Sequence, residues 1–103
     1  MTPRQIRITP NAWADLRAIE AFLRREAGEG AAQKFSARVF DKLDQLTRFP
    51  QTGRSIGRVQ PSVRFTTIRP WLIFYEDLSS RNLVLVRRIV DGRRDLRAMT
   101  GLL

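Results

Sequence analysis

Two segments with helical periodicity, joined by a very short glycine linker, most strongly limit the folds open to this chain. Apolar residues recur at helical spacing from Asn11 to about Ala27, and again from about Ala31 to Arg48. Only Gly28-Glu29-Gly30 separates the two segments. Because so short a linker cannot run back along a helix, the sequence predicts two antiparallel helices, an αα-hairpin.

Strand-like runs flank this helical hairpin. Four runs are expected to form strands: 4–8, and about 63–69, 71–78 and 82–90. Residues 50–62 carry two Pro and two Gly without a clear period and indicate a loop, and a short final helix is expected from Asp95 to about Thr100. Helices followed by strands indicate the α+β class: a helical hairpin packed on a small twisted antiparallel sheet, in a single domain spanning 1–103.

The residue types that the chain lacks exclude several kinds of site. It contains neither Cys nor His, so a disulfide framework, a thiolate metal site and a catalytic triad are excluded. The acidic residues show no metal-ligand spacing, and we expect neither a metal nor another cofactor, and assign no catalytic residue. No apolar run approaches the ~20 residues of a membrane span. We therefore expect a cytoplasmic protein without a membrane partner.

Positive charge is the strongest compositional signal. The formal net charge is +9 at pH 7, which indicates an anionic partner, either nucleic acid or an acidic protein, or simply arginine-rich ordinary surfaces. Arg64, Arg69 and Arg87 are candidates for a basic face on the open side of the sheet. Such a face would suit phosphates or the acidic tail of a partner.

Two aromatic residues depart from the apolar stripes of the helices. Phe22 and Phe40 lie about 100° away from their stripes at the helical rotation of about 100° per residue. Exposed aromatic side chains mark partner sites in some proteins. The alternative is a wide helix interface, in which each helix packs on both the sheet and its neighbour.

Four stretches, in order, resemble the ParE/RelE superfamily of bacterial toxins from toxin–antitoxin pairs. They are ADLRAIEAFL, AAQKFSARVFDKLDQLTRFPQTGR, WLIFY and LVLVRRIVDGRRD, and the resemblance covers roughly residues 5–97. It implies a helical hairpin on a twisted antiparallel sheet. It also implies a cognate ParD-like antitoxin that forms a hetero-oligomer by laying an extended or helical segment over the hairpin and sheet, with Phe22 and Phe40 as candidate contacts.

The superfamily contains two activities, and the resemblance favours one of them. RelE-like members cut mRNA in the ribosome and often carry Arg after the first aromatic residue of the central strand, where this chain has Leu72. Their terminal Tyr or His would fall near Thr100, but no Tyr or His follows Tyr75. ParE-like members poison DNA gyrase, and the FPQTGR loop looks ParE-like. We therefore expect a gyrase poison, with nucleic acid contacted only through gyrase or the antitoxin.

The candidate target-binding residues of this ParE-like interpretation are Arg93, Arg94 and Asp95, in the segment that the family implicates in toxicity. Asp95 has the alternative role of capping the final helix, and the alternative for Arg93 is a solvated surface side chain. Two other functions remain open. One is a RelE-like ribosome-dependent endoribonuclease, in which the phosphate-binding residues would be Arg69, Arg87 and Arg94 and the only available phenol would be Tyr75. The other is a non-toxic module that only binds antitoxin.

Overall fold

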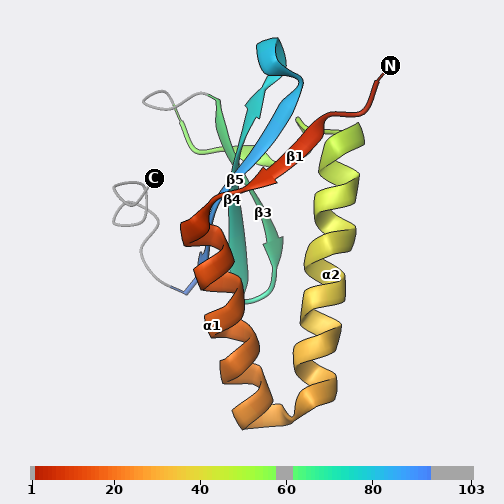
Figure 1. Cartoon of the computed structure of the whole chain (residues 1–103). Helices are drawn as coiled ribbons and strands as arrows, with labels where there is room; N and C mark the ends of the chain where they lie inside the picture. Colours follow the sequence, from red (N-terminus) through yellow and green to blue (C-terminus); the bar gives the residue numbers. More distant parts are fainter. Residues whose placement is uncertain (1, 58–61, 94–103) are drawn as a thin grey trace.

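The computed structural model describes residues 2–57 and 62–93, which form two helices and a five-stranded sheet (Figure 1). The elements in chain order are β1 (Gln5–Ile8), α1 (Pro10–Ala27), α2 (Glu29–Arg48), β2 (Arg54–Ser55), β3 (Val63–Ile68), β4 (Trp71–Leu78), a 3₁₀ turn (Ser79–Arg81) and β5 (Leu83–Asp91). The two helices of the predicted hairpin and the four predicted strands are confirmed within a few residues, and the final helix predicted from Asp95 to about Thr100 lies outside the described residues. No helix in these described ranges is long and apolar enough to cross a membrane.

The helical hairpin is tighter than the sequence predicts. Thr9 caps α1 by accepting a hydrogen bond from the Ala12 N–H at 3.1 Å, with Pro10 in the first turn. Gly28 ends α1 at a φ of +92° and donates its N–H to the Arg24 carbonyl. Because α2 already begins at Glu29, Gly28 is the whole linker, and a positive φ there suits glycine.

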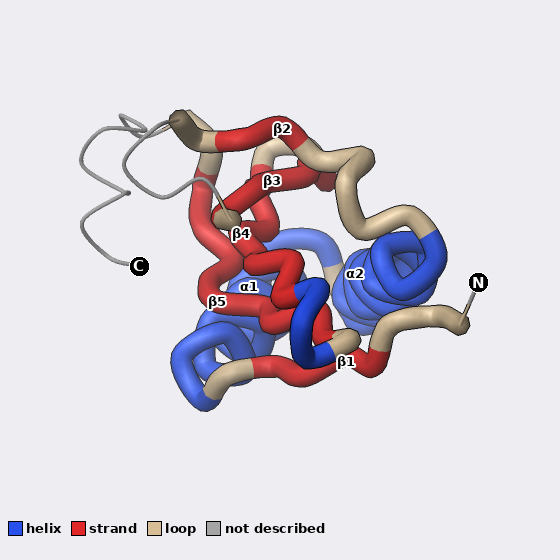
Figure 2. Tube along the Cα trace, turned by 90° about the horizontal axis from the view of Figure 1, so that it is seen from above, coloured by secondary structure: helices blue, strands red, loops and turns tan. Residues whose placement is uncertain are grey.

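The sheet is mixed, which corrects the expectation of a purely antiparallel one. The strand order is β1-β5-β4-β3-β2, as Figure 2 shows from above. All neighbours are antiparallel except β1 and β5, which run parallel from Gln5↔Leu83 to Ile8↔Val86. Two helices and three strands of the described chain lie between β1 and β5, and they supply the long connection that this parallel pairing requires. The α+β class itself is confirmed.

Two apolar clusters hold the layers together. The larger lies between the helices and one face of the sheet; its buried members include Leu16, Phe35, Leu46, Ile73 and Tyr75. The smaller lies on the open face and is formed by Val63, Leu72 and Phe74, with Ile56, Phe65 and Val90 packed against it. The alternation of side chains along β4 therefore supplies both faces with apolar contacts.

The start of α1 is fastened to a bulge in β5. The register shifts between Phe74, which pairs with Arg88, and Tyr75, which pairs with Val86. Thr9 donates its hydroxyl to the Arg87 carbonyl at 2.9 Å, next to the end of β1. Asp15 accepts two hydrogen bonds from the Arg88 guanidinium, at 2.7 and 3.1 Å, and one from the Ile89 N–H at 2.9 Å. Asp15 thus replaces β1 as the partner of β5 where β1 has ended.

Candidate partner-binding surfaces

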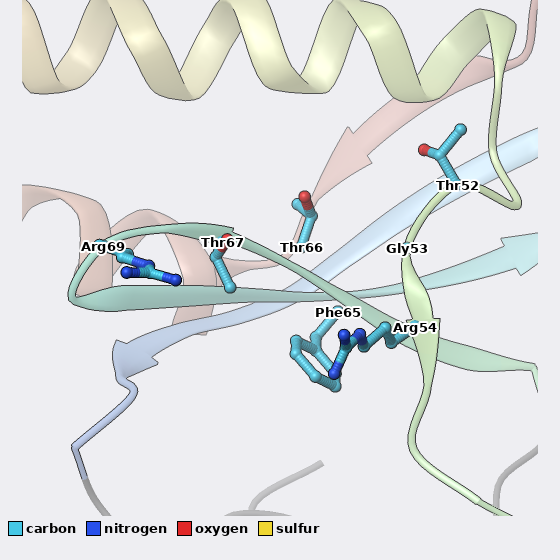
Figure 3. A pocket seen from close by; sticks show the side chains of 7 residues that line it. All are labelled: Thr52, Gly53, Arg54, Phe65, Thr66, Thr67 and Arg69. Carbon is cyan, nitrogen blue, oxygen red and sulfur yellow. The ribbon is translucent and has the colours of Figure 1, made fainter.

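A pocket of about 320 Å³ lies along β3 and the loop before β2, at the edge of the sheet away from β4 (Figure 3). Seven residues line it: Thr52, Gly53, Arg54, Phe65, Thr66, Thr67 and Arg69. Arg54 lies beside its cross-strand partner Phe65 at one end, and Arg69 lies next to Thr67 at the other. The pocket therefore offers two guanidinium groups, one aromatic ring and several hydroxyl groups, and no acidic side chain.

A buried phenol holds the loop that forms one wall of this pocket. Tyr75 is fully buried, donates its hydroxyl to the Pro50 carbonyl at 2.8 Å and accepts a hydrogen bond from the Gly53 N–H at 3.0 Å. Arg64 donates to the Gly53 carbonyl at 2.8 Å. These contacts fix the position of the backbone just before Arg54.

The phenol of Tyr75 should ionise only in strongly alkaline solution. Burial raises the pKa of Tyr75 above its ordinary value of about 10, against the opposing effects of the Gly53 hydrogen bond and the Arg64 charge. The pKa of Tyr75 is higher in the folded protein than in the unfolded chain. The contribution of the neutral phenol to folding stability is therefore fully present below about pH 10 and is lost as the pH rises through the folded-state pKa. Tyr75 is the only tyrosine, so phenolate absorbance measures this group alone. A folded midpoint no higher than that of the unfolded chain would contradict the assignment, and Tyr75→Phe supplies the blank.

The three residues of the predicted basic face are not brought together. Arg64 pairs with Tyr75 across β3 and β4 and so lies on the helical side of the sheet, where it binds the loop. Arg87 forms an ion pair with Glu76. Arg69 alone of the three lines the pocket described above.

Arg93 lies at the end of β5, beside a second pocket. Asp91 accepts hydrogen bonds from the Arg93 N–H at 2.9 Å and from its guanidinium at 2.6 to 3.1 Å, and this contact raises the pKa of Arg93. The second pocket, of about 330 Å³, is lined by both Arg69 and Arg93. Beside this pocket the backbone of Gly92 lies close to Pro70 and donates its N–H to the Pro70 carbonyl. A side chain at position 92 would prevent this contact, since a Cβ there would meet the Pro70 carbonyl oxygen at 2.8 Å. Arg94 and Asp95 lie outside the described residues.

A comparison with known protein families shows which family the chain belongs to. The family model described as the ParE toxin of the type II toxin–antitoxin system parDE matches residues 6–96. The chain belongs to the ParE toxin family. This family membership agrees with the resemblance that the sequence motifs show.

Known relatives of this ParE-family chain agree in sequence and in fold. Toxin ParE3 of Caulobacter vibrioides is 33% identical over 64 residues, a match that spans 62% of each chain. A chain of the chromosomal ParDE system of P. aeruginosa superposes with a TM-score of 0.71 at 21% identity, covering 85% of this chain and 95% of that one. A chain of the RelBE2 toxin–antitoxin complex of Mycobacterium tuberculosis gives 0.65 at 18% identity, covering 86% and 98%. The isolated E. coli RelE toxin gives 0.60 at 14%, covering 97% and 99%.

The two predicted antitoxin contacts, Phe22 and Phe40, differ in their surroundings. Phe40 is 46% exposed and packs against Trp13 of α1, with ring centroids 6.2 Å apart. Trp13, one of the regularly spaced apolar residues of the first periodic segment, is itself 39% exposed. Phe22 is 44% exposed and does not belong to this ring pair. An aromatic patch therefore bridges the two helices at Trp13 and Phe40.

Sequence reasoning missed two contributors to the surface. Arg54 was assigned to a flexible loop, because a strand of two residues shows no periodicity, yet it pairs with Phe65. Trp13 fitted the apolar stripe of its helix and gave no sign of exposure. Among the described residues no group of three metal-ligating side chains gathers that would hold an ion.

Proposed function

We propose that this ParE-family toxin inhibits DNA gyrase and is neutralised by a ParD-like antitoxin in a hetero-oligomeric complex. The observation that carries the proposal is the environment of the only phenol. Tyr75 is fully buried, both of its hydrogen bonds are made to backbone groups, and the chain contains no His. Proton transfer to or from a substrate would require a group within hydrogen-bond reach of it. This speaks against a tyrosine- or histidine-dependent ribonuclease.

The position of Leu72 supports the same proposal. RelE-like sequences often carry an arginine here, whereas Leu72 is only 8% exposed and belongs to the apolar cluster of the open face. That position therefore supplies packing and no charge for a phosphate. The remaining argument for the ribonuclease alternative is the pair of guanidinium groups, Arg54 and Arg69, at the first pocket.

The proposed target implies a cytoplasmic site of action, and the antitoxin is proposed to cover the aromatic patch of Trp13 and Phe40. Induced expression in bacteria tests the target. Growth arrest with loss of plasmid supercoiling and intact mRNA would support gyrase. Arrest with cut mRNA would replace the proposal by the ribonuclease, and normal growth would favour a module that only binds antitoxin.

Replacing Arg93 with alanine is expected to weaken gyrase inhibition roughly tenfold. Arg93 is exposed and lies at the end of β5, in the segment that leads to Arg94 and Asp95. Arginines are enriched among residues that dominate binding energy. The measurement is the toxin concentration that halves supercoiling by purified gyrase. Arg81→Ala is the matched control, since Arg81 is exposed in the turn between β4 and β5. Equal inhibition by both variants would remove Arg93 from the target-binding surface.

A further inference from the structure

The outer edge of β3 is only partly covered by another strand. β2 pairs with just two residues of β3, through Arg54↔Phe65 and Ser55↔Arg64. β3 continues to Ile68, and among the described residues no strand lies beside Thr66–Ile68 on the side away from β4. The first pocket lies along this uncovered stretch, as Figure 3 shows.

The direction of the backbone groups along this edge follows from one hydrogen bond. The Val63 carbonyl accepts from the Ile56 N–H at 3.2 Å, on the side away from β4. Backbone groups alternate in direction along a strand of an antiparallel pair, so those of Phe65 and Thr67 point the same way as those of Val63. The backbone of Thr67 therefore presents one N–H donor and one C=O acceptor to the pocket. Thr67 is exposed to solvent.

The edge is flanked by positive charge that is not neutralised within the described part of the chain. Arg54 and Arg69 are both exposed, and neither guanidinium group has a hydrogen bond or ion pair with another described residue. The two residues lie at opposite ends of the uncovered stretch, since Arg54 is opposite Phe65 and Arg69 directly follows Ile68. Four residues of strand correspond to about 13 Å.

We propose that this edge binds an extended acidic segment of a partner protein as an added strand, with carboxylates set against Arg54 and Arg69. A strand supplies an acceptor for the Thr67 N–H and a donor for its carbonyl. A phosphate backbone offers acceptors only, and so it would leave the carbonyl unpaired. Because Arg54 already lies opposite Phe65, the added strand can lie only along Thr66–Ile68, and the two arginines call for an acidic residue at each end of it. The identification of this partner as the antitoxin rests on the proposed function.

The charge requirement can be tested with peptides of defined sequence. The probe is a nine-residue peptide of alternating Val and Thr with Glu at positions three and seven, blocked at both ends. A Lys counterpart and a single-stranded oligodeoxynucleotide serve as competitors. We expect the Glu peptide to bind. Substituting both Arg54→Glu and Arg69→Glu in one protein should lower its affinity for this peptide roughly tenfold or more. The control protein carries both Arg38→Glu and Arg81→Glu. These substitutions make the same change of charge at exposed positions on α2 and in the turn between β4 and β5.

The strand-addition requirement needs a backbone variant. Thr67→Pro removes the outward N–H and leaves the hydrogen bonds of β3 to β4 in place, because the Thr67 groups do not face β4. We expect it to abolish peptide binding, and we expect the peptide to slow hydrogen exchange of the Thr67 amide in the unaltered protein. If Thr67→Pro does not fold, the exchange measurement and the arginine variants decide the matter.

Three results would overturn the proposal: equal affinity for the Glu and Lys peptides, stronger binding of the oligonucleotide, or unchanged exchange at Thr67. The assay contains no gyrase, so its failure would leave the proposed target in place. If instead the peptide binds but the protein leaves gyrase unaffected, the strand-binding edge stands and the gyrase proposal fails.

Discussion

Asp15→Ala is expected to lower the free energy of unfolding by about 2–3 kcal/mol. The Asp15 carboxylate accepts hydrogen bonds from the Arg88 guanidinium and from the Ile89 N–H, and the side chains of the ion pair are largely shielded from water. Alanine would leave a half-buried cation and a backbone donor without partners. Since these contacts fasten α1 to β5, the midpoint of thermal unfolding should fall by about 10–15 °C.

The control for Asp15 is an acid on the outside of the other helix. Asp41 is exposed on α2, and Asp41→Ala should change the unfolding free energy by less than about 0.5 kcal/mol. Denaturant unfolding of the three proteins under the same conditions measures both effects. If the two variants are equally stable, Asp15 does not hold the helical hairpin on the sheet as described.

Gly53→Ala is expected to destabilise the fold by about 3 kcal/mol. A Cβ at Gly53 would collide with the Tyr75 hydroxyl and would lie 2.8 Å from the Phe65 carbonyl oxygen. Neither obstacle can move easily, because Tyr75 is fully buried and the Phe65 carbonyl belongs to β3. The loop from Pro50 to Gly53 would separate from the sheet, and Arg54 would leave its place beside Phe65.

A second glycine supplies a control with the opposite sign. Gly30 lies in the first turn of α2, and a Cβ there would meet no atom within 4 Å. Gly30→Ala should therefore stabilise the protein by about 0.5 kcal/mol through its higher helix propensity. Unfolding in denaturant separates the two outcomes. A Gly53→Ala protein as stable as the unaltered one would show that the loop does not pack on Tyr75.

Periodicity in the sequence was sufficient to predict the helices and the longer strands. The stripes of α1 and α2 and the apolar runs in β4 and β5 are long enough to fix their type. The alternation in residues 4–8 indicates a strand but does not name its partner, so the parallel pairing of β1 with β5 was not predicted. The bulge in β5 was also missed, because it arises from the contacts of Arg87 and Arg88 with other elements.

The candidate surfaces were less predictable than the fold. Arg64 and Arg69 are five positions apart, and an odd separation along the strand predicted at 63–69 would place the two side chains on opposite faces. That signal was present in the sequence and would have separated them. The pairing of Arg54 with Phe65 could not be predicted, because it depends on Gly53 packing against Tyr75, which is 22 residues away in the chain.

The most direct test of the proposed activity is a supercoiling assay with purified gyrase, relaxed plasmid and the unaltered protein. We predict that supercoiling is inhibited and that linear, gyrase-cleaved plasmid accumulates as the protein concentration rises. Normal supercoiling at a large excess of folded protein, with no cleaved plasmid, would contradict the assignment of gyrase as the target.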